Sequence, residues 1–441
     1  MTYVQIAGDS GTGGATLTAV GNNSVIVDAA VPGLVNLVNL TNQRIYNPTR
    51  FQLTTAEKYV YTIDQTLGVT AMTDPNGNTL TINTNGVIHS SGKSILFTRD
   101  SSGRITRITD PSGSELNYSF NLGGDLASFT DRAGATTNFS YNAAHGLVTI
   151  ADPRGIQPIR NDYDADGRLL SHTDAFGHVI NYTHNLAANH EEITDRLGHT
   201  TTYEYDANGN VLTLTDAQNN TTTYTYDDRD NKLTETNALG KTTTFTYDAK
   251  DNLETQTDPL GNVTRYTYND LRQVLTVTDP KLGVTTNVYD LKGNLLSTED
   301  ALGKTTSFTY LQSGVRETMT DALGKVTRYE YAGFSSPTKE TDALGHATSY
   351  AYDSNGNRTS QTTTRTLASG ATETLTTTFE YDLQNRLTKT IYPDGTSTRV
   401  GYNSIGQQVA TIDQLGRQTS FEYDAMGRMT RTVYPDTTSE I

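Results

Sequence analysis

Cysteine is absent from the 441 residues of this chain, and only 34% of the residues are hydrophobic. The lack of cysteine excludes a disulfide framework, a thiolate zinc site and a cysteine nucleophile. The hydrophobic content is low for a compact core. The chain nevertheless has 26 tyrosines and 37 glycines. This combination is typical of β-rich proteins and differs from the aromatic-poor composition of disordered chains.

Basic residues and long apolar runs are also scarce. The chain has 33 lysines and arginines against 49 acidic residues, a net charge of −16. This balance argues against nucleic acid as a partner, because phosphate binding relies on basic residues. No apolar run reaches the roughly 18 residues of a membrane-spanning helix, and the first residues lack the charged and apolar regions of a signal peptide. We therefore expect no membrane insertion, and export by a route that the sequence does not show.

Common catalytic and cofactor motifs are missing as well. The sequence has no Gly-x-Ser-x-Gly elbow, no P-loop and no dinucleotide-binding fingerprint. The Gly-Asp-Ser-Gly stretch at residues 8–11 is similar to a serine-protease motif, but we interpret it as part of a flexible glycine-rich segment. We expect a protein without enzymatic activity and without a cofactor.

A 21-residue period runs through the sequence from about residue 51. Tyr205 is followed by a tyrosine at every step of 21 up to Tyr352, and the same step leads backwards through His184 to Tyr163. One interval of 22 precedes Tyr163, and one interval of 29 follows Tyr352. Sixteen equivalent positions result. The repeat tyrosines that we single out are Tyr163, Tyr205, Tyr226, Tyr247, Tyr268, Tyr289, Tyr310, Tyr331, Tyr352, Tyr381, Tyr402 and Tyr423.

Each repeat predicts a β-hairpin. In residues 221–240, Thr222, Tyr224 and Tyr226 alternate along one strand face, followed by a polar break, a second short strand and the break "NALG". We therefore predict an all-β fold in which tandem 21-residue hairpins form one long antiparallel sheet. Tyrosine and leucine would lie on one face, and threonine and charged residues on the other. Because open sheets of more than about ten strands curl or split, we expect a spiral that forms an open or partial shell, a cocoon.

The aspartates of the repeat fall where turns begin. Asp206 and Asp216 each start a polar break, and glycines such as Gly240 and Gly261 follow three residues after an Asp or Asn. Asp and Asn bond their own backbone at the first turn position, and glycine adopts positive φ readily. We interpret these carboxylates as turn formers.

The repeats "TTYEYDANGNVLTLTD" (residues 201–216) and "TTFTYDAKDNLETQTDPLGN" (residues 243–262) resemble the YD repeats of bacterial Rhs proteins, wall-associated proteins, the C component of Tc toxins and the teneurin shell. The resemblance covers residues 51–441. It implies a β-shell that in polymorphic toxin systems encloses a C-terminal toxin, and that in teneurins serves cell–cell adhesion. Rhs shells often carry an aspartyl self-cleavage motif with a proline five residues before the Asp-Pro. This sequence lacks that proline, so we assign no protease residues.

Two regions are expected. Residues 1–50 form a non-repeat β-rich segment, either a cap or the end of a preceding domain, and residues 51–441 form the repeat shell. The last residues, "RTVYPDTTSEI", parallel "KTIYPDGTSTRV" at residues 389–400. This parallel places the next tyrosine three residues beyond Ile441, so we expect the native array to continue there. An eight-residue insertion within residues 361–382 predicts a longer hairpin or a contact loop.

Two groups of side chains raise the question of a metal site. Asp162, Asp164 and Asp166 match the first half of a calcium loop, but the glutamate required at position twelve is replaced by Thr173. We keep calcium as a weak alternative to a plain acidic turn. Histidines 172, 178, 184, 190 and 199 cluster in sequence and are capable of binding zinc, yet two of them occupy a variable turn position that we interpret as solvated.

The leading hypothesis is a structural, encapsulating or displaying shell of a secreted or cell-surface bacterial Rhs-type protein. Its expected partner is an effector or toxin domain outside these 441 residues. A carbohydrate- or cell-surface-binding adhesion module is the first alternative, since the tyrosine rows could stack on sugars, although cross-strand aromatic packing explains them more simply. A fragment of a self-cleaving toxin carrier is the second.

Overall fold

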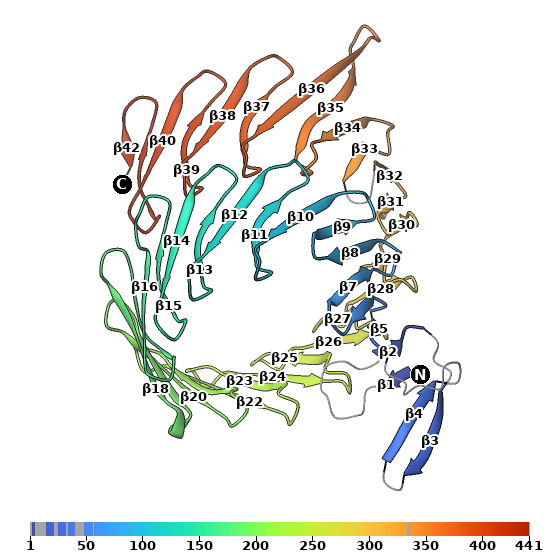
Figure 1. Cartoon of the computed structure of the whole chain (residues 1–441). Helices are drawn as coiled ribbons and strands as arrows, with labels where there is room; N and C mark the ends of the chain where they lie inside the picture. Colours follow the sequence, from blue (N-terminus) through green and yellow to red (C-terminus); the bar gives the residue numbers. More distant parts are fainter. Residues whose placement is uncertain are drawn as a thin grey trace. The chain divides into compact units, whose positions relative to one another are not determined.

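The computed structural model describes residues 2–4, 15–21, 25–31, 34–39, 48–55, 57–332 and 336–440. Within these ranges the chain forms β-strands and one short 3-10 helix, Leu186–Ala188 (Figure 1). Forty strands belong to one sheet, while β3 (Val25–Val31) and β4 (Leu34–Asn39) form a separate antiparallel pair. The predicted all-β array of hairpins is confirmed. The described part of the chain has no helix that is long and apolar enough to cross a membrane.

Two compact units divide the chain, and each combines segments that are far apart in sequence. Unit 1 consists mainly of residues 1–94 and 243–329, and unit 2 mainly of residues 95–242 and 336–441. The strands that lie wholly or mostly in unit 1, apart from β3 and β4, are Thr2–Val4 (β1), Thr16–Ala19 (β2), Arg50–Thr54 (β5), Val60–Asp64 (β6), Gly68–Thr73 (β7), Thr79–Asn83 (β8), Gly86–His89 (β9), Thr242–Tyr247 (β24), Leu253–Thr257 (β25), Val263–Tyr268 (β26), Val274–Thr278 (β27), Val284–Tyr289 (β28), Leu295–Glu299 (β29), Thr305–Tyr310 (β30), Arg316–Thr320 (β31) and Val326–Tyr331 (β32).

Unit 2 holds the remaining strands. They are Ser94–Arg99 (β10), Ile105–Thr109 (β11), Glu115–Phe120 (β12), Leu126–Thr130 (β13), Thr136–Tyr141 (β14), Leu147–Ala151 (β15), Ile159–Tyr163 (β16), Leu169–Thr173 (β17), Val179–Asn185 (β18), His190–Thr194 (β19), Thr200–Tyr205 (β20), Val211–Thr215 (β21), Thr221–Tyr226 (β22), Lys232–Thr236 (β23), Pro337–Thr341 (β33), Ala347–Tyr352 (β34), Arg358–Thr366 (β35), Thr372–Tyr381 (β36), Leu387–Ile391 (β37), Ser397–Tyr402 (β38), Gln408–Ile412 (β39), Gln418–Tyr423 (β40), Met429–Val433 (β41) and Ser439–Glu440 (β42).

The hairpin of β24 and β25 shows the repeating register. Its backbone pairs run from Thr244 with Thr257 to Tyr247 with Leu253, and the register shifts by one residue just before Tyr247. The turn at residues 248–252 causes this shift, because Asp251 takes the left-handed conformation with φ 64°. A type I turn followed by a left-handed residue produces a bulge of this kind. Tyr205, Tyr226, Tyr310 and Tyr423 likewise end their strands at a bulge.

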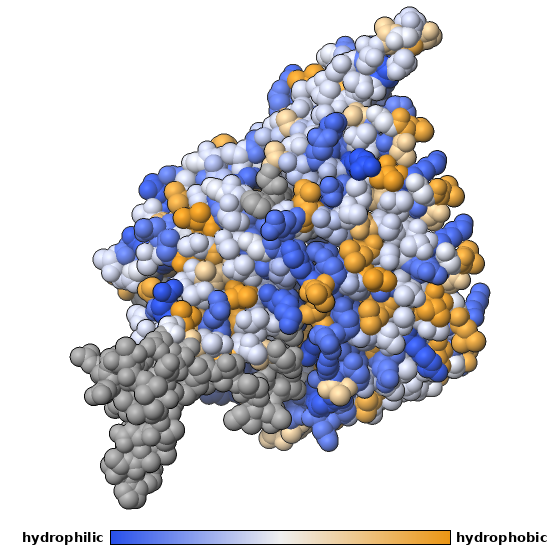
Figure 2. All heavy atoms as spheres, turned by 90° about the vertical axis from the view of Figure 1, so that its right-hand side faces the viewer, coloured by the Kyte–Doolittle hydropathy of each residue, from blue (hydrophilic) through white to orange (hydrophobic). Residues whose placement is uncertain are grey.

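The two faces of the sheet differ as predicted. In β22, Tyr224 and Tyr226 are half-buried while Thr223 and Thr225 are exposed. Among the residues whose burial the structure describes, only five are buried, and Ala19 is the one hydrophobic residue among them. Figure 2 shows hydrophobic residues as separate groups among polar ones on the face that it presents. Strand-to-strand contacts, as in other repeat proteins, thus stabilise the sheet in place of a central core.

The start of the expected repeat region lies within the main sheet. Strand β2 pairs with both β1 and β5, so the main sheet continues across residue 50, where we expect a boundary.

The insertion forms the longer hairpin that we considered: β35 and β36 are nine and ten residues long and pair up to Thr366 with Thr372. This hairpin projects beyond its neighbours β34 and β37 in unit 2 (Figure 1).

Candidate functional site: the tyrosine ladder and the turn edges

The ladder tyrosines bind the strand that precedes their own. The hydroxyl of Tyr310 on β30 donates to the carbonyl oxygen of Leu295 on β29, at 2.8 Å. Backbone pairing between these strands ends at Ser297, so the hydroxyl joins them beyond the paired region. Burial raises the pKa of the Tyr310 hydroxyl. The same contact, at 2.6–3.2 Å, is made by Tyr163, Tyr268, Tyr289, Tyr352, Tyr381, Tyr402 and Tyr423.

This contact persists where the sequence spacing is irregular. Fifteen residues separate donor and acceptor in most repeats, but 23 separate Tyr381 from Arg358, because the insertion lies between them. His184, which replaces a ladder tyrosine, places Nε2 at 2.7 Å from the carbonyl oxygen of Leu169, again fifteen residues earlier. The contact is therefore a property of the hairpin geometry rather than of tyrosine alone.

The remaining ladder positions differ in their contacts. The Tyr205 hydroxyl donates to Oε2 of Glu191 at 3.1 Å in place of a backbone carbonyl. The rings of Tyr203 and Tyr205 stack, with centroids 6.4 Å apart. Tyr226, Tyr247 and Tyr331 occupy the same half-buried face. Tyr205, Tyr310 and the seven tyrosines with the same contact thus donate their hydroxyls to groups of the sheet itself.

The turns lie along the two edges of the sheet, at the ends of the strands. We call a run of consecutive hairpins a strip. We call the turns that follow a ladder strand, such as residues 206–210, the tyrosine edge, and the turns that precede one, such as residues 258–262, the opposite edge. In the latter, Asp258 Oδ1 accepts the N–H groups of Leu260 and Asn262 at 2.8 and 2.9 Å, and Oδ2 accepts the Asn262 side-chain amide at 2.8 Å. The side chain of Asn262, and then its backbone N–H, hold the pKa of Asp258 below its usual value.

The fifth turn position is a functional part of this motif that sequence reasoning missed. We interpreted His178 and His199 there as solvated, and their side chains, like that of His346 at the equivalent position, are indeed 54–66% exposed. Their Nδ1 atoms nevertheless lie within 2.9–3.3 Å of the aspartate that opens the turn. Asn and Arg make the equivalent contact in other turns, for example at Asn210 and Arg386. In the sequence, the recurring Asp-x-x-Gly-Asn pattern indicates this contact between the fifth turn residue and the opening aspartate.

The structure places the calcium candidates in a turn of the same kind. Asp164 Oδ1 accepts the N–H of Asp166 and of Arg168, and Oδ2 accepts the Arg168 guanidinium at 2.7 Å. Asp166 also pairs with Arg168, while Asp162 lies on β16 and accepts the Ser171 hydroxyl at 2.9 Å. Within the described residues, no three His, Asp or Glu side chains are grouped to hold a metal ion. Calcium binding stays a prediction that a calcium titration can test.

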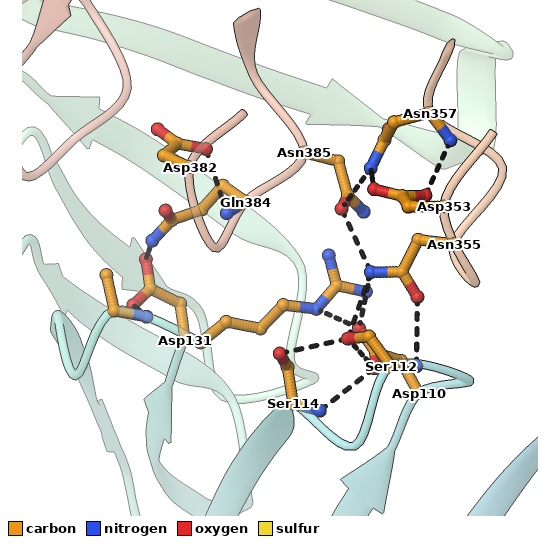
Figure 3. A network of polar contacts seen from close by, with 12 residues as sticks. Asp110, Ser112, Ser114, Asp131, Asp353, Asn355, Asn357, Asp382, Gln384 and Asn385 are labelled. Atoms are coloured by element: carbon orange, nitrogen blue, oxygen red, sulfur yellow. Dashed lines mark hydrogen bonds and ion pairs between the residues drawn. The ribbon is translucent and has the colours of Figure 1, made fainter. Parts of the chain in front are cut away.

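A polar seam joins two strips within unit 2 (Figure 3). The side-chain amide of Asn355, on the tyrosine edge, lies 3.3 Å from Asp110 Oδ2 and 3.1 Å from the Ser112 hydroxyl, both on the opposite edge of a strip 243–245 residues earlier. In return, Ser112 donates its N–H to Asn355 Oδ1 at 3.1 Å. Asn355 also donates to Asn385 Oδ1 at 3.0 Å. Asn355 thus joins its own tyrosine-edge turn both to the neighbouring tyrosine-edge turn and to one opposite-edge turn.

Asp110 is an enclosed carboxylate of this seam. Its side chain is only 6% exposed, and Arg132 Nε lies 3.0 Å from Oδ2, an ion pair whose N–H is not aligned for a hydrogen bond. Burial acts to raise the pKa of Asp110, but the Ser112 hydroxyl and the N–H groups of Ser114 and Ser112 outweigh it and lower that pKa. The next turn repeats the docking, because Gln384 Nε2 donates to Asp131 Oδ2 at 3.0 Å (Figure 3).

Unit 1 contains a seam of the same construction. Asn78 donates its side-chain amide to the carbonyl oxygen of Ser313 at 2.9 Å, and Asn294 donates to Asn76 Oδ1 at 3.2 Å. Residues 74–78 form an opposite-edge turn, whereas residues 290–294 and 311–315 form tyrosine-edge turns. In both units, therefore, the opposite edge of the earlier strip docks on the tyrosine edge of the later strip.

Comparison with known families gives two matches. The family described as Teneurin YD-shell matches residues 49–201. The family described as RHS Repeat matches residues 191–221, 205–242, 226–261, 247–282, 337–372, 361–397 and 402–439. No curated protein matches the sequence.

Solved structures show similarity at low sequence identity. The crystal structure of TcdB2-TccC3-TEV is 13% identical over 93% of this chain and 28% of that one, with a TM-score of 0.48. The crystal structure of TcdB2-TccC3 is 13% identical over 95% and 28%, with the same TM-score. For the Tc holotoxin pore of Photorhabdus luminescens the identity is 13%, the coverage 95% and 29%, and the TM-score 0.44. This chain thus spans less than a third of each of these chains.

The two family matches follow the hairpins that the structure contains. The RHS Repeat segments cover successive pairs of tyrosine-edge and opposite-edge turns, and the YD-shell match begins beside β5, at the first strand of the regular array. The repeat period, the ladder contact and the aspartate turns recur through the matched residues. The chain belongs to the YD-repeat, or Rhs-repeat, family.

Proposed function

We propose that this chain is a wall segment of an encapsulating YD-type shell, which encloses or displays another polypeptide and performs no catalysis itself. The observation that carries the proposal is the seam in each unit, where one strip docks edge to edge on another. A strand of six residues is about 20 Å long, so two docked strips make a wall roughly 40 Å wide. A folded domain of 100 residues has a radius of gyration of about 13 Å, and a wall of this width can cover it.

The enclosed polypeptide in this proposal is an effector or toxin domain of a bacterial, secreted or surface-displayed Rhs-type protein. The YD-shell and RHS Repeat matches support this assignment. The chemistry of the sheet favours a wall over a glycan-binding surface, since eight ladder hydroxyls donate to carbonyls of the sheet and are not offered to a sugar.

A cargo-protection experiment tests the enclosing role. An unfolded, protease-sensitive polypeptide is appended after Ile441, and as a control the same polypeptide is placed before Met1. If the shell encloses a polypeptide attached to its C-terminal end, the C-terminal cargo survives a protease dose that digests the N-terminal one. Equal digestion at both ends contradicts the proposal. A glycan array on the same protein distinguishes the enclosing role from the adhesion alternative. Reproducible binding to a glycan, together with a cargo that is not protected from protease, would favour adhesion.

A further inference from the structure

A cavity of about 790 Å³ lies in unit 1, beside the tyrosine-edge turns at residues 269–273 and 290–294. Five of the residues that line it are apolar or aromatic: Leu271, Leu275, Val288, Tyr289 and Leu291. Four others are charged, and they include Lys58 from the earlier strip. Sites for small ligands have volumes of roughly 300–1000 Å³ and combine an apolar lining with a few polar groups. The cavity has both properties.

Three of these apolar residues depart from the repeat. Thr267 and Thr309 occupy the position of Val288 in the hairpins on either side, and their hydroxyls bond a threonine of the next strand at 2.6 and 2.8 Å. Val288 is 47% exposed and cannot make this bond. On the turns, the hairpins on either side have lysine at the position of Leu271, and Asp or Gln at the position of Leu291, which is 94% exposed. Two neighbouring hairpins thus bring apolar side chains to one cavity where the repeat has polar ones.

The charged side chains of the cavity leave one ammonium group without a carboxylate of its own. Lys250 Nζ lies 2.9 Å from Oδ1 of Asp270. Asp290 is engaged by its own turn, where its carboxylate accepts two backbone N–H groups and one side-chain amide. Lys58, on the turn at residues 55–59, makes no ion pair within the described part of the chain. It lies close enough to Asp270 to contribute, after Lys250, to the lowered pKa of that carboxyl.

We propose that this cavity binds an amphipathic anion, a small molecule with an apolar body and one carboxylate. The apolar body packs on Leu271, Leu275 and Leu291, which removes their exposed surface from water. The carboxylate accepts from the Lys58 ammonium, and a charge-assisted hydrogen bond of this kind is stronger than a neutral one. A cation with the same apolar body binds less well, because both carboxylates of the cavity already have partners. The site is independent of the enclosing role proposed above.

Isothermal titration calorimetry on the full chain tests the ligand class with two probes that carry apolar chains of similar length, sodium decanoate and decyltrimethylammonium bromide. Decanoate should bind at one site per chain with a Kd on the order of 0.1–1 mM, as expected for so small a ligand. The ammonium probe should bind about tenfold more weakly. The absence of saturable decanoate binding overturns the proposal, and equal binding of the two probes overturns the assignment of an anion.

Variants of the cavity test its location. Val288→Thr/Leu291→Gln gives both positions the residues of the next hairpin along the chain, so the fold is kept while decanoate affinity falls about tenfold or more. Lys58→Gln weakens decanoate by about tenfold and leaves the ammonium probe unchanged. Leu323→Gln is the matched control, because Leu323 is 79% exposed elsewhere in unit 1, and it binds like the wild type. Unchanged decanoate affinity in either cavity variant, or an equal loss in the control, overturns the proposal.

Discussion

Replacing Tyr310 by phenylalanine removes one oxygen atom and leaves the half-buried ring in place. The hydroxyl donates to the Leu295 carbonyl at 2.8 Å, beyond the point where the β29–β30 backbone pairing ends. A hydrogen bond of this type contributes about 0.5–1.5 kcal/mol net. We expect a loss of about 1 kcal/mol of local stability, because no cavity forms. Since one kcal/mol corresponds to roughly a fivefold change in an opening equilibrium, amides of β29 and β30 should exchange roughly five times faster.

Hydrogen–deuterium exchange with peptide-level mass spectrometry measures this change directly, and it avoids assuming two-state unfolding for a long repeat array. Tyr226→Phe is the matched control. Tyr226 holds the same ladder position and is half-buried, but its hydroxyl makes no hydrogen bond within the described residues. The exchange of β21 and β22 should therefore stay unchanged. Equal acceleration at both positions, or none at Tyr310, would refute the idea that the hydroxyl closes the diverging strands.

Other perturbations address the remaining contacts. His184→Tyr should keep the bond to the Leu169 carbonyl and preserve the melting temperature, whereas His184→Phe should lower it; equal melting of both variants would contradict the shared contact. Asp258→Ala should speed exchange in β25 and β26 more than Asp258→Asn, because asparagine retains the Oδ1 acceptor. The lowered pKa of Asp258 means that its stabilisation is present above the ordinary carboxyl pKa of about 3.9 and is lost as the pH falls through the lower folded value. The melting temperature of wild type should thus fall below about pH 4, and by less in Asp258→Asn. Asn355→Ala should release protection in its own turn and also around Asp110, 245 residues away; a purely local effect would argue against the seam.

The hairpin architecture follows from the sequence because its causes are local. Alternation of Tyr224 and Tyr226 defines one strand face, and the aspartate at each break specifies a turn through its own carboxylate. The fifth turn residue was harder to interpret. Asn262 looks like any polar surface residue until the Oδ2 contact with Asp258 is seen.

The seams could not be predicted from the period. Asn355 meets Asp110 across 245 residues of sequence, and no single repeat encodes such a contact, because the twist of a sheet accumulates over many strands. The sequence near residue 355 does not distinguish its turn from the turn at residues 206–210 of the earlier strip. There Asn208 occupies the same position as Asn355 but donates instead to Asp230 of the next hairpin at 2.9 Å. Long-range docking depends on cumulative geometry, whereas the hairpin depends on its own 21 residues.

The two irregular repeat lengths show how such an array tolerates growth. Eight extra residues divide equally between β35 and β36 and extend their pairing to seven residue pairs, while Tyr381 keeps its ladder contact. The single extra residue before Tyr163 cannot be shared between two strands, and β15 and β16 retain only two pairs. An odd residue within a strand would turn every later side chain to the wrong face. An insertion with an even number of residues, divided equally between the two strands of one hairpin, therefore leaves the register of the sheet intact. The neighbouring repeats then need no compensating mutations.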